Sequence, residues 1–186
     1  MIAFLKGRPM IAGQDLLVID VHGVGYLVHA TQKLIQLAAS VQEMSVHVEL
    51  QLRQDSLMLF GFETVKEREM FCLLTQVSGV GGKLAMAVLN SLSLEAIASA
   101  SIAQDANIMR KVPGVGPKLA QKMLLDLKGK AERIAQPLAS GAMQDAVEAL
   151  VCLGISRQEA QIRVDKVAKA ADGTLALEEL IRRALS

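Results

Sequence analysis

Up to about residue 62, the pattern of apolar and polar positions predicts strands, with apolar, branched stretches over residues 1–7 and 16–21 and alternating positions later. The alternation is clearest over residues 45–53, where Val46, Val48, Leu50 and Leu52 lie between polar neighbours, which is the period of a half-buried strand. Strands are expected over residues 1–7, 16–21, 24–30, 45–53 and 57–62, and a short helix opened by Thr31 over residues 32–39. This order favours a small β-barrel of the OB type over residues 1–62, with an open meander as the alternative.

From Thr64 onward the apolar positions recur at helical spacing. Thr64 with Glu67 three residues later has the spacing of a capping box, which marks the start of a helix. Further helices are expected up to Ser91, from Ser93 to about residue 100, over residues 104–111, and from Pro117 to about residue 135. Residues 63–135 are therefore expected to form an all-α domain.

The segment Gln-Pro-Leu-Ala-Ser-Gly-Ala at residues 136–142 is small, uncharged and contains both proline and glycine, so it is expected to be a short flexible linker. Three helices are expected after it, over residues 144–153, 156–170 and 174–185, in a small domain spanning 143–186. Gly154 is placed to end the first of these helices and Ser156 to cap the second. The fold class is therefore a multidomain α+β chain.

Two glycine-rich segments repeat each other at an offset of 35 residues. The first reads Val-Ser-Gly-Val-Gly-Gly-Lys-Leu-Ala at residues 77–85, and the second Val-Pro-Gly-Val-Gly-Pro-Lys-Leu-Ala at residues 112–120. The same offset aligns Leu89 with Leu124 and Leu92 with Leu127. A match of this length indicates an internal duplication.

Each repeat has the residue types of a helix-hairpin-helix motif that grips a DNA backbone. Glycines there can take positive φ, the central valine can fill the gap between two helices, and the next helix presents its free N–H groups to an anion. A lysine in that first turn is unfavourable to the helix dipole, so a nearby phosphate would account for it. The predicted DNA-binding residues are Gly79, Val80, Gly81, Lys83, Gly114, Val115, Gly116, Lys118 and Lys122.

The alternative interpretation is that the glycines only make two tight turns in a helical domain. The duplication with lysine in register favours DNA binding, as does the distribution of charge: the net charge is +3 over residues 63–135 and −1 on either side, as phosphate binding requires. A P-loop is excluded, because no Gly-x-x-x-x-Gly-Lys-Ser/Thr run is present.

The remaining composition excludes several classes. The chain is 52% hydrophobic, which excludes a wholly disordered protein. Cys72 and Cys152 are far apart in apolar helical stretches and are expected to be buried free thiols, and the three histidines lack zinc-ligand spacing. No signal peptide or long apolar run is visible, so a soluble cytoplasmic protein is expected.

With its segments placed, the full chain resembles the RuvA family of bacterial Holliday junction proteins. The resemblance rests on Met-Ile-Ala-Phe-Leu-Lys-Gly at 1–7, Gly-Val-Gly-Tyr at 23–26, Leu-Met-Leu-Phe-Gly-Phe at 57–62, both hairpins, and Glu-Ala-Leu-Val-Cys-Leu-Gly-Ile at 148–155. Hairpin pairs occur in many repair proteins. Their position after a β-barrel and before a three-helix domain is more specific.

The resemblance implies a non-catalytic, structure-selective DNA-binding subunit for branch migration in recombinational repair. A homotetramer, or an octamer on DNA, would hold a four-way junction open and square-planar, with each hairpin pair on the minor-groove side of a duplex arm. The last domain resembles a ubiquitin-associated (UBA-like) bundle and would contact the hexameric RuvB ATPase through Leu150, Leu153 and Ile155. The RuvC resolvase is a further implied partner. No cofactor is implied for this chain, because the motor uses the ATP.

Two positions depart from the family pattern. The family carries an acidic pin in the turn after the fourth strand, commonly with two acids, and this chain has Gln54 followed by Asp55. Half the usual charge would constrain the junction less. The second departure is Pro117, where some members carry lysine.

No catalytic constellation is visible: there is no supportable Ser/His/Asp arrangement and no carboxylate cluster for a two-metal nuclease. A repair nuclease or ligase would need a catalytic domain for which the chain offers no candidate. A scaffold with purely structural hairpins, or a general DNA binder without junction selectivity, remains as an alternative.

Overall fold

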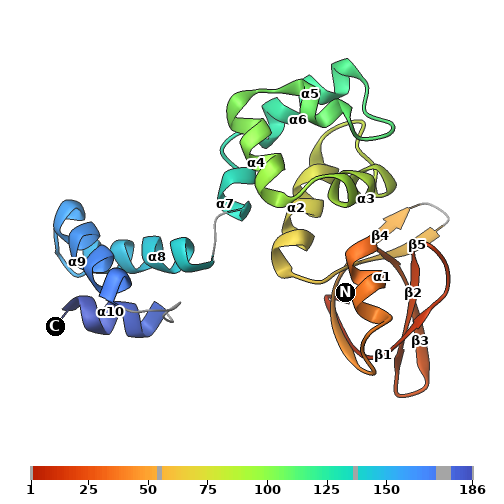
Figure 1. Ribbon diagram of the computed structural model, residues 1–186, viewed down its shortest axis with the longest axis horizontal. Coiled ribbons are helices and arrows are strands. Elements are labelled where there is room, and N and C mark those ends of the chain that lie inside the picture. The colour runs from red at the N-terminus through yellow and green to blue at the C-terminus, as the bar shows by residue number, and fades with distance from the viewer. Residues whose placement is uncertain (1, 54–55, 136–137, 171–176, 186) are drawn as a thin grey trace. The chain divides into compact units, whose positions relative to one another are not determined.

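The computed structural model describes residues 2–53, 56–135, 138–170 and 177–185 (Figure 1). These residues divide into two compact units, 1–135 and 136–186. The first unit contains the barrel and the two glycine hairpins, and the second contains the C-terminal helices.

The barrel of the first unit is closed. Its elements are β1 (Phe4–Ile11), β2 (Leu16–Val21), β3 (Val24–Ala30), α1 (Gln32–Ala38), β4 (Met44–Arg53) and β5 (Ser56–Phe62). The strand order is β1-β2-β3-β5-β4. Antiparallel pairing of β1 with β4 closes the ring, and the β3–β5 pair alone is parallel. The predicted OB-type barrel is therefore confirmed, and the alternative of an open meander is excluded.

The inward-facing side chains of the strands form the core of the barrel. Val46 and Val48 point inward and are buried, and Leu17, Ile19 and Val28 join them in the core. Helix α1 covers this core with Leu34 and is capped by Thr31, whose hydroxyl accepts from the Leu34 amide at 3.3 Å.

β1 runs past the predicted end at residue 7. Its first half, through Gly7, pairs with β4, and residues from Arg8 to Ile11 pair with β2. Beyond Gly7 the strand therefore has a registered neighbour on one side only. Pro9 lies in that part of the strand, where a residue without an N–H is tolerated.

Six helices complete the first unit: α2 (Val65–Gln76), α3 (Gly82–Ser91), α4 (Leu94–Ala103), α5 (Ala106–Arg110), α6 (Pro117–Leu127) and α7 (Ala131–Ala135). Thr64 caps α2 as predicted, accepting from the Glu67 amide at 3.2 Å. The Glu67 carboxylate in turn accepts from the Glu63 amide at 3.1 Å.

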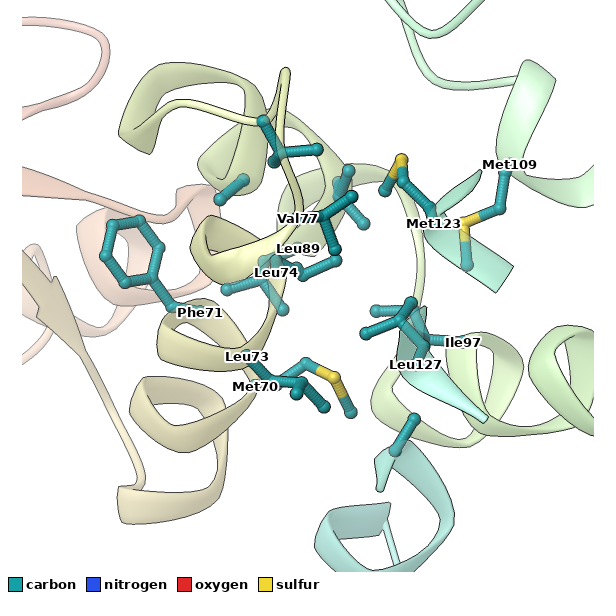
Figure 2. Close-up of a cluster of buried hydrophobic side chains, with 14 of the residues drawn as sticks. Met70, Phe71, Leu73, Leu74, Val77, Leu89, Ile97, Met109, Met123 and Leu127 are labelled. Carbon is teal, nitrogen blue, oxygen red and sulfur yellow. The ribbon is translucent and has the colours of Figure 1, made fainter. Parts of the chain in front are cut away.

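Side chains from α2, α3, α4 and α6 meet in one apolar core. Figure 2 shows Leu74 and Val77 of the first repeat together with Met109, Met123 and Leu127 of the second and Ile97 of α4. The prediction of a single helix from Pro117 to residue 135 is wrong. Gly129 takes φ +74° between α6 and α7, a left-handed conformation that ends helices.

The second unit is a three-helix bundle of α8 (Leu138–Cys152), α9 (Arg157–Ala170) and α10 (Leu177–Leu185). Its core contains Val147, Leu150, Val164 and Leu180. The predicted linker is too long at its C-terminal side, because α8 already begins at Leu138; residues 136–137 lie outside the described residues. Cys152 is exposed, contrary to expectation, while Cys72 is half-buried.

Candidate nucleic-acid interface

The two glycine segments form the same turn twice. The first connects α2 to α3 and the second connects α5 to α6. Gly79 has φ +98° and Gly114 has φ +89°, values that favour glycine strongly. In each turn the valine amide closes a short hydrogen bond, from Val80 to the Val77 carbonyl at 2.9 Å and from Val115 to the Val112 carbonyl at 3.1 Å.

Each turn is followed by a helix whose first backbone amides have no hydrogen-bond acceptor among the residues that the structure describes. Gly81 and Gly116 are the N-caps and provide no side-chain oxygen. The first helical bonds come from Ala85 to Gly81 and from Ala120 to Gly116, both at 2.9 Å. The amides of residues 82–84, and of 118 and 119, donate to no acceptor within the described parts of the chain. Such N–H groups at a helix N-terminus favour an anion.

Lysines lie beside both sets of free amides. Lys83 and Lys118 are exposed in the first turns of α3 and α6, and Lys122 is exposed one turn further along α6. None of the three forms an ion pair in the part of the chain that the structure describes. Their charges are therefore available to a ligand.

The hairpin valines have a structural part in this arrangement. Val80 is 5% exposed and Val115 is 7% exposed, and both belong to the helical core. Their side chains fill the gap between helices, as predicted. A direct DNA contact by either residue would have to come from its backbone.

The hairpins pack against each other reciprocally. A Cβ built on Gly79 would lie 3.3 Å from Leu119 Cδ1, and one built on Gly114 would lie 3.2 Å from Leu84 Cδ1. Leu84 and Leu119 are equivalent positions of the two repeats. The repeats are therefore related by an approximate two-fold axis, and the same axis relates the two predicted anion sites.

The first hairpin is also fixed to the barrel, which the sequence did not reveal. The Gln32 amide donates to Asn90 Oδ1 at 2.9 Å, and Arg68 Nε lies 3.0 Å from Glu49 Oε2. These contacts connect α3 to the start of α1 and α2 to β4. The sequence contains one sign of this contact with the barrel. Gly82 differs from the equivalent residue of the second repeat, which is Pro117.

Two other sets of site residues were predicted outside the hairpin segments of the sequence, the pin and the motor contacts. The pin positions Gln54 and Asp55 lie outside the described residues. Of the predicted motor contacts, Leu150 is completely buried in the core of the second unit, so its assignment as a surface contact is corrected. Ile155 is partly buried against the same core, and Leu153 is 63% exposed.

Nothing in the described residues provides a metal site, since no three His, Cys, Asp or Glu side chains come together to hold an ion. Among the same residues no single helix is long and apolar enough to cross a membrane. The adjoining helices α3 and α4 reach that length and apolarity only as a pair, and they bend by 97° at the break between them.

Comparison with known proteins covers the whole chain. Residues 1–61 match the family model of the RuvA N terminal domain, residues 71–130 that of the SAM-like helix-hairpin-helix tandem, and residues 141–186 that of the RuvA C-terminal domain. Similar relatives are named Holliday junction branch migration complex subunit RuvA. That of Zymomonas mobilis is 39% identical, over 100% of this chain and 97% of its own. That of Paramagnetospirillum magneticum is 40% identical, over 100% and 96%. The chain therefore belongs to the RuvA family.

Proposed function

We propose that this protein is the DNA-binding subunit of a Holliday junction branch migration complex. In this role it recognises the four-way junction, holds it open and square-planar, and recruits a RuvB-type ATPase that drives branch migration. The observation that carries the proposal is the pair of symmetry-related helix N-termini, each with free amides and a lysine without an ion pair. They occur in a chain that matches relatives of that name from end to end.

The arrangement suits a duplex backbone rather than a base sequence. Free amides and lysines recognise phosphate, which every sequence presents. The approximate two-fold axis between the hairpins matches the local two-fold symmetry of a duplex, so each hairpin can hold one strand. Lys83 serves the first strand in this proposal, and Lys118 with Lys122 serves the second.

Assembly into a homotetramer, or an octamer on DNA, is part of the proposal. Barrel side chains that a single chain leaves exposed support it: Phe4, Ile11, Leu27, Leu52 and Leu57 are each about half exposed or more. Apolar area of this kind commonly marks an interface. Four copies around one axis would place four hairpin pairs on four duplex arms, with Asp55 and Gln54 proposed at the junction centre.

The second unit is proposed to bind the RuvB hexamer. Leu153, at the turn between α8 and α9, is the exposed apolar residue that supports this, with Ile155 beside it. Contact with a RuvC resolvase belongs to the same proposal. ATP hydrolysis is assigned to the motor, because this sequence contains no P-loop. The subunit would act without a cofactor, in the cytoplasm.

A general double-hairpin DNA binder without junction selectivity is the second candidate, because backbone contacts alone do not distinguish a junction from a linear duplex. A competition gel shift separates the two. A labelled four-way junction is bound to the full chain in magnesium without ATP and challenged with excess linear duplex of the same sequence. Retention of the junction complex is expected. Equal competition by the duplex would leave only the general binder.

A further inference from the structure

A cleft of about 240 Å³ lies between helix α3 and the barrel. Met86, Ala87 and Asn90 line it on the helix side, together with Lys83 at the start of the helix. Its barrel side includes Asp15 and His29. The cleft therefore begins at the lysine of the first hairpin and continues along the helix.

The lining combines charged groups with an apolar floor. Lys83 and Asp15 are both exposed, and neither forms an ion pair in the described residues. Phe60 is fully buried beneath the cleft, and the His29 ring stacks on it with centroids 5.3 Å apart and planes 27° apart. His29 is thereby held as a fixed aromatic wall.

The Asn90 side chain is oriented by the barrel. Its Oδ1 accepts from the Gln32 amide at 2.9 Å, so its NH₂ group remains a donor. A cation, a carboxylate, an amide donor and a flat aromatic surface thus line the same cleft. A phosphate alone would use only the donors, would be repelled by Asp15, and would leave the apolar floor empty.

The second repeat provides an internal comparison. The α6 positions equivalent to Met86, Ala87 and Asn90 are Gln121, Lys122 and Leu125, and all three are exposed. Lys122 and Leu125 are larger than Ala87 and Asn90, so at these two positions the helix leaves more room only in the copy that faces the barrel. The cleft is a property of the first repeat and not of the motif.

We propose that this cleft binds one unpaired nucleotide of the DNA strand held by the first hairpin. Lys83 pairs with its phosphate, the base lies on the floor beside His29, and the Asp15 carboxylate accepts from an exocyclic amine of the base. Cytosine and adenine carry such an amine, and thymine does not. The proposal rests on the proposed duplex binding of the first hairpin and adds a place for a base that has left its pair.

The test compares three labelled duplexes of one sequence in binding titrations with the full chain. One is fully paired, one carries a single bulged cytosine, and one a single bulged thymine. Base stacking and hydrogen bonding in such a site predict about tenfold tighter binding of the cytosine bulge than of the paired duplex. The thymine bulge is expected to bind more weakly than the cytosine bulge.

Two variants address the cleft itself. Asp15→Asn keeps the shape of the side chain and replaces the charged acceptor by a neutral amide, whose oxygen is a weaker acceptor, so it should reduce the cytosine preference with little effect on the paired duplex. Ala87→Leu fills the cleft from its helix side, at a position whose repeat equivalent is a lysine, and should abolish the preference for either bulge. Glu43→Gln is the control, because it removes an exposed barrel carboxylate that pairs with Lys6 outside the cleft.

Equal affinity for the paired and bulged duplexes would overturn the inference and leave the proposed function standing. Tighter binding of all three duplexes by Asp15→Asn would also overturn it, because the cleft would then hold phosphate only. Failure to bind both these duplexes and a four-way junction would overturn the proposed function together with this inference.

Discussion

Gly82 lies against the ring of Phe60, and their fit leaves no room for a side chain. A Cβ built on Gly82 would lie 2.9 Å from Phe60 Cε2 and 2.7 Å from Gln51 Oε1. Phe60 cannot swing away, because it is fully buried and its ring packs on Phe71 with centroids 4.8 Å apart. Helix α3 can therefore approach the barrel this closely only because its first residue is glycine.

Gly82→Ala is expected to destabilise the first unit by about 1–3 kcal/mol, the usual cost of overpacking a filled site. Gly116→Ala is the matched control, since a Cβ there meets nothing within 4 Å and its φ is −82°. Denaturant unfolding of both variants measures the difference. Equal stability would mean that the contact between α3 and the barrel is loose.

Gly79→Ala is expected to cost about 1–2 kcal/mol from the left-handed backbone alone. Its Cβ would also press on Leu119 at 3.3 Å and disturb the second hairpin. Gly23→Ala, with φ +88° and open space around it, carries only the backbone cost. Duplex affinity should fall for Gly79→Ala and not for Gly23→Ala. A parallel loss in both would point to general instability.

Lys118→Ala should weaken duplex binding to a similar extent for all sequences and flatten the log–log salt dependence by about 0.9, the value for one lost phosphate contact on duplex DNA. Titrations at several salt concentrations measure this slope. Lys166→Ala, an exposed lysine of α9 in the other unit, is the control and should change neither quantity. An unchanged slope for Lys118→Ala would remove Lys118 from the interface.

The two cysteines should differ strongly in alkylation. Burial, reinforced by the nearby Glu49 carboxylate, raises the pKa of the Cys72 thiol to about 11. At pH 8 only about one Cys72 in a thousand is then a thiolate, the form that reacts, whereas Cys152 is exposed. Iodoacetamide at pH 8 should label Cys152 first, and the Cys72 rate should rise as the pH approaches 11. Mass spectrometry of timed digests gives both rates, and comparable labelling at pH 8 would contradict this environment.

Substitutions at Leu150 and Leu153 are expected to differ, because the first should affect stability and the second partner binding. Leu150→Ala removes a fully buried side chain from the three-helix core and should cost about 2–5 kcal/mol of unfolding free energy in the second unit. Leu153→Ala changes an exposed side chain and should leave stability within about 0.5 kcal/mol while weakening capture of a RuvB-type motor. Undiminished capture by a folded Leu153→Ala protein would place the contact elsewhere.

The sequence predicted the features that depend on local chemistry. Apolar, branched stretches and the alternation over residues 45–53 located the five strands, and the Gly-Val-Gly segments located both hairpins, because each signal is contained within a few residues. Gly129 could also have indicated the break between α6 and α7, since glycine commonly ends a helix. The helical spacing of apolar positions continues past it, however, so periodicity alone predicts one helix.

Features that depend on distant residues were not available from the sequence. Closure of the barrel needs the β1–β4 and β3–β5 pairings, which join segments far apart in the chain. The burial of Leu150 is set by α9 and α10 packing on α8, and no local pattern distinguished it from Leu153. The cleft needs His29 of the barrel beside α3, a neighbour that the repeat itself does not predict.

The reciprocal contact of Gly79 with Leu119 and Gly114 with Leu84 has a consequence for how this duplication can evolve. Each copy supplies a leucine that completes the turn of the other, so neither copy is a self-sufficient module. Deleting one would uncover the turn of the survivor instead of restoring a simpler ancestral motif. Recombination can therefore transfer the pair as one block, whereas an exchange that separates its halves would be selected against.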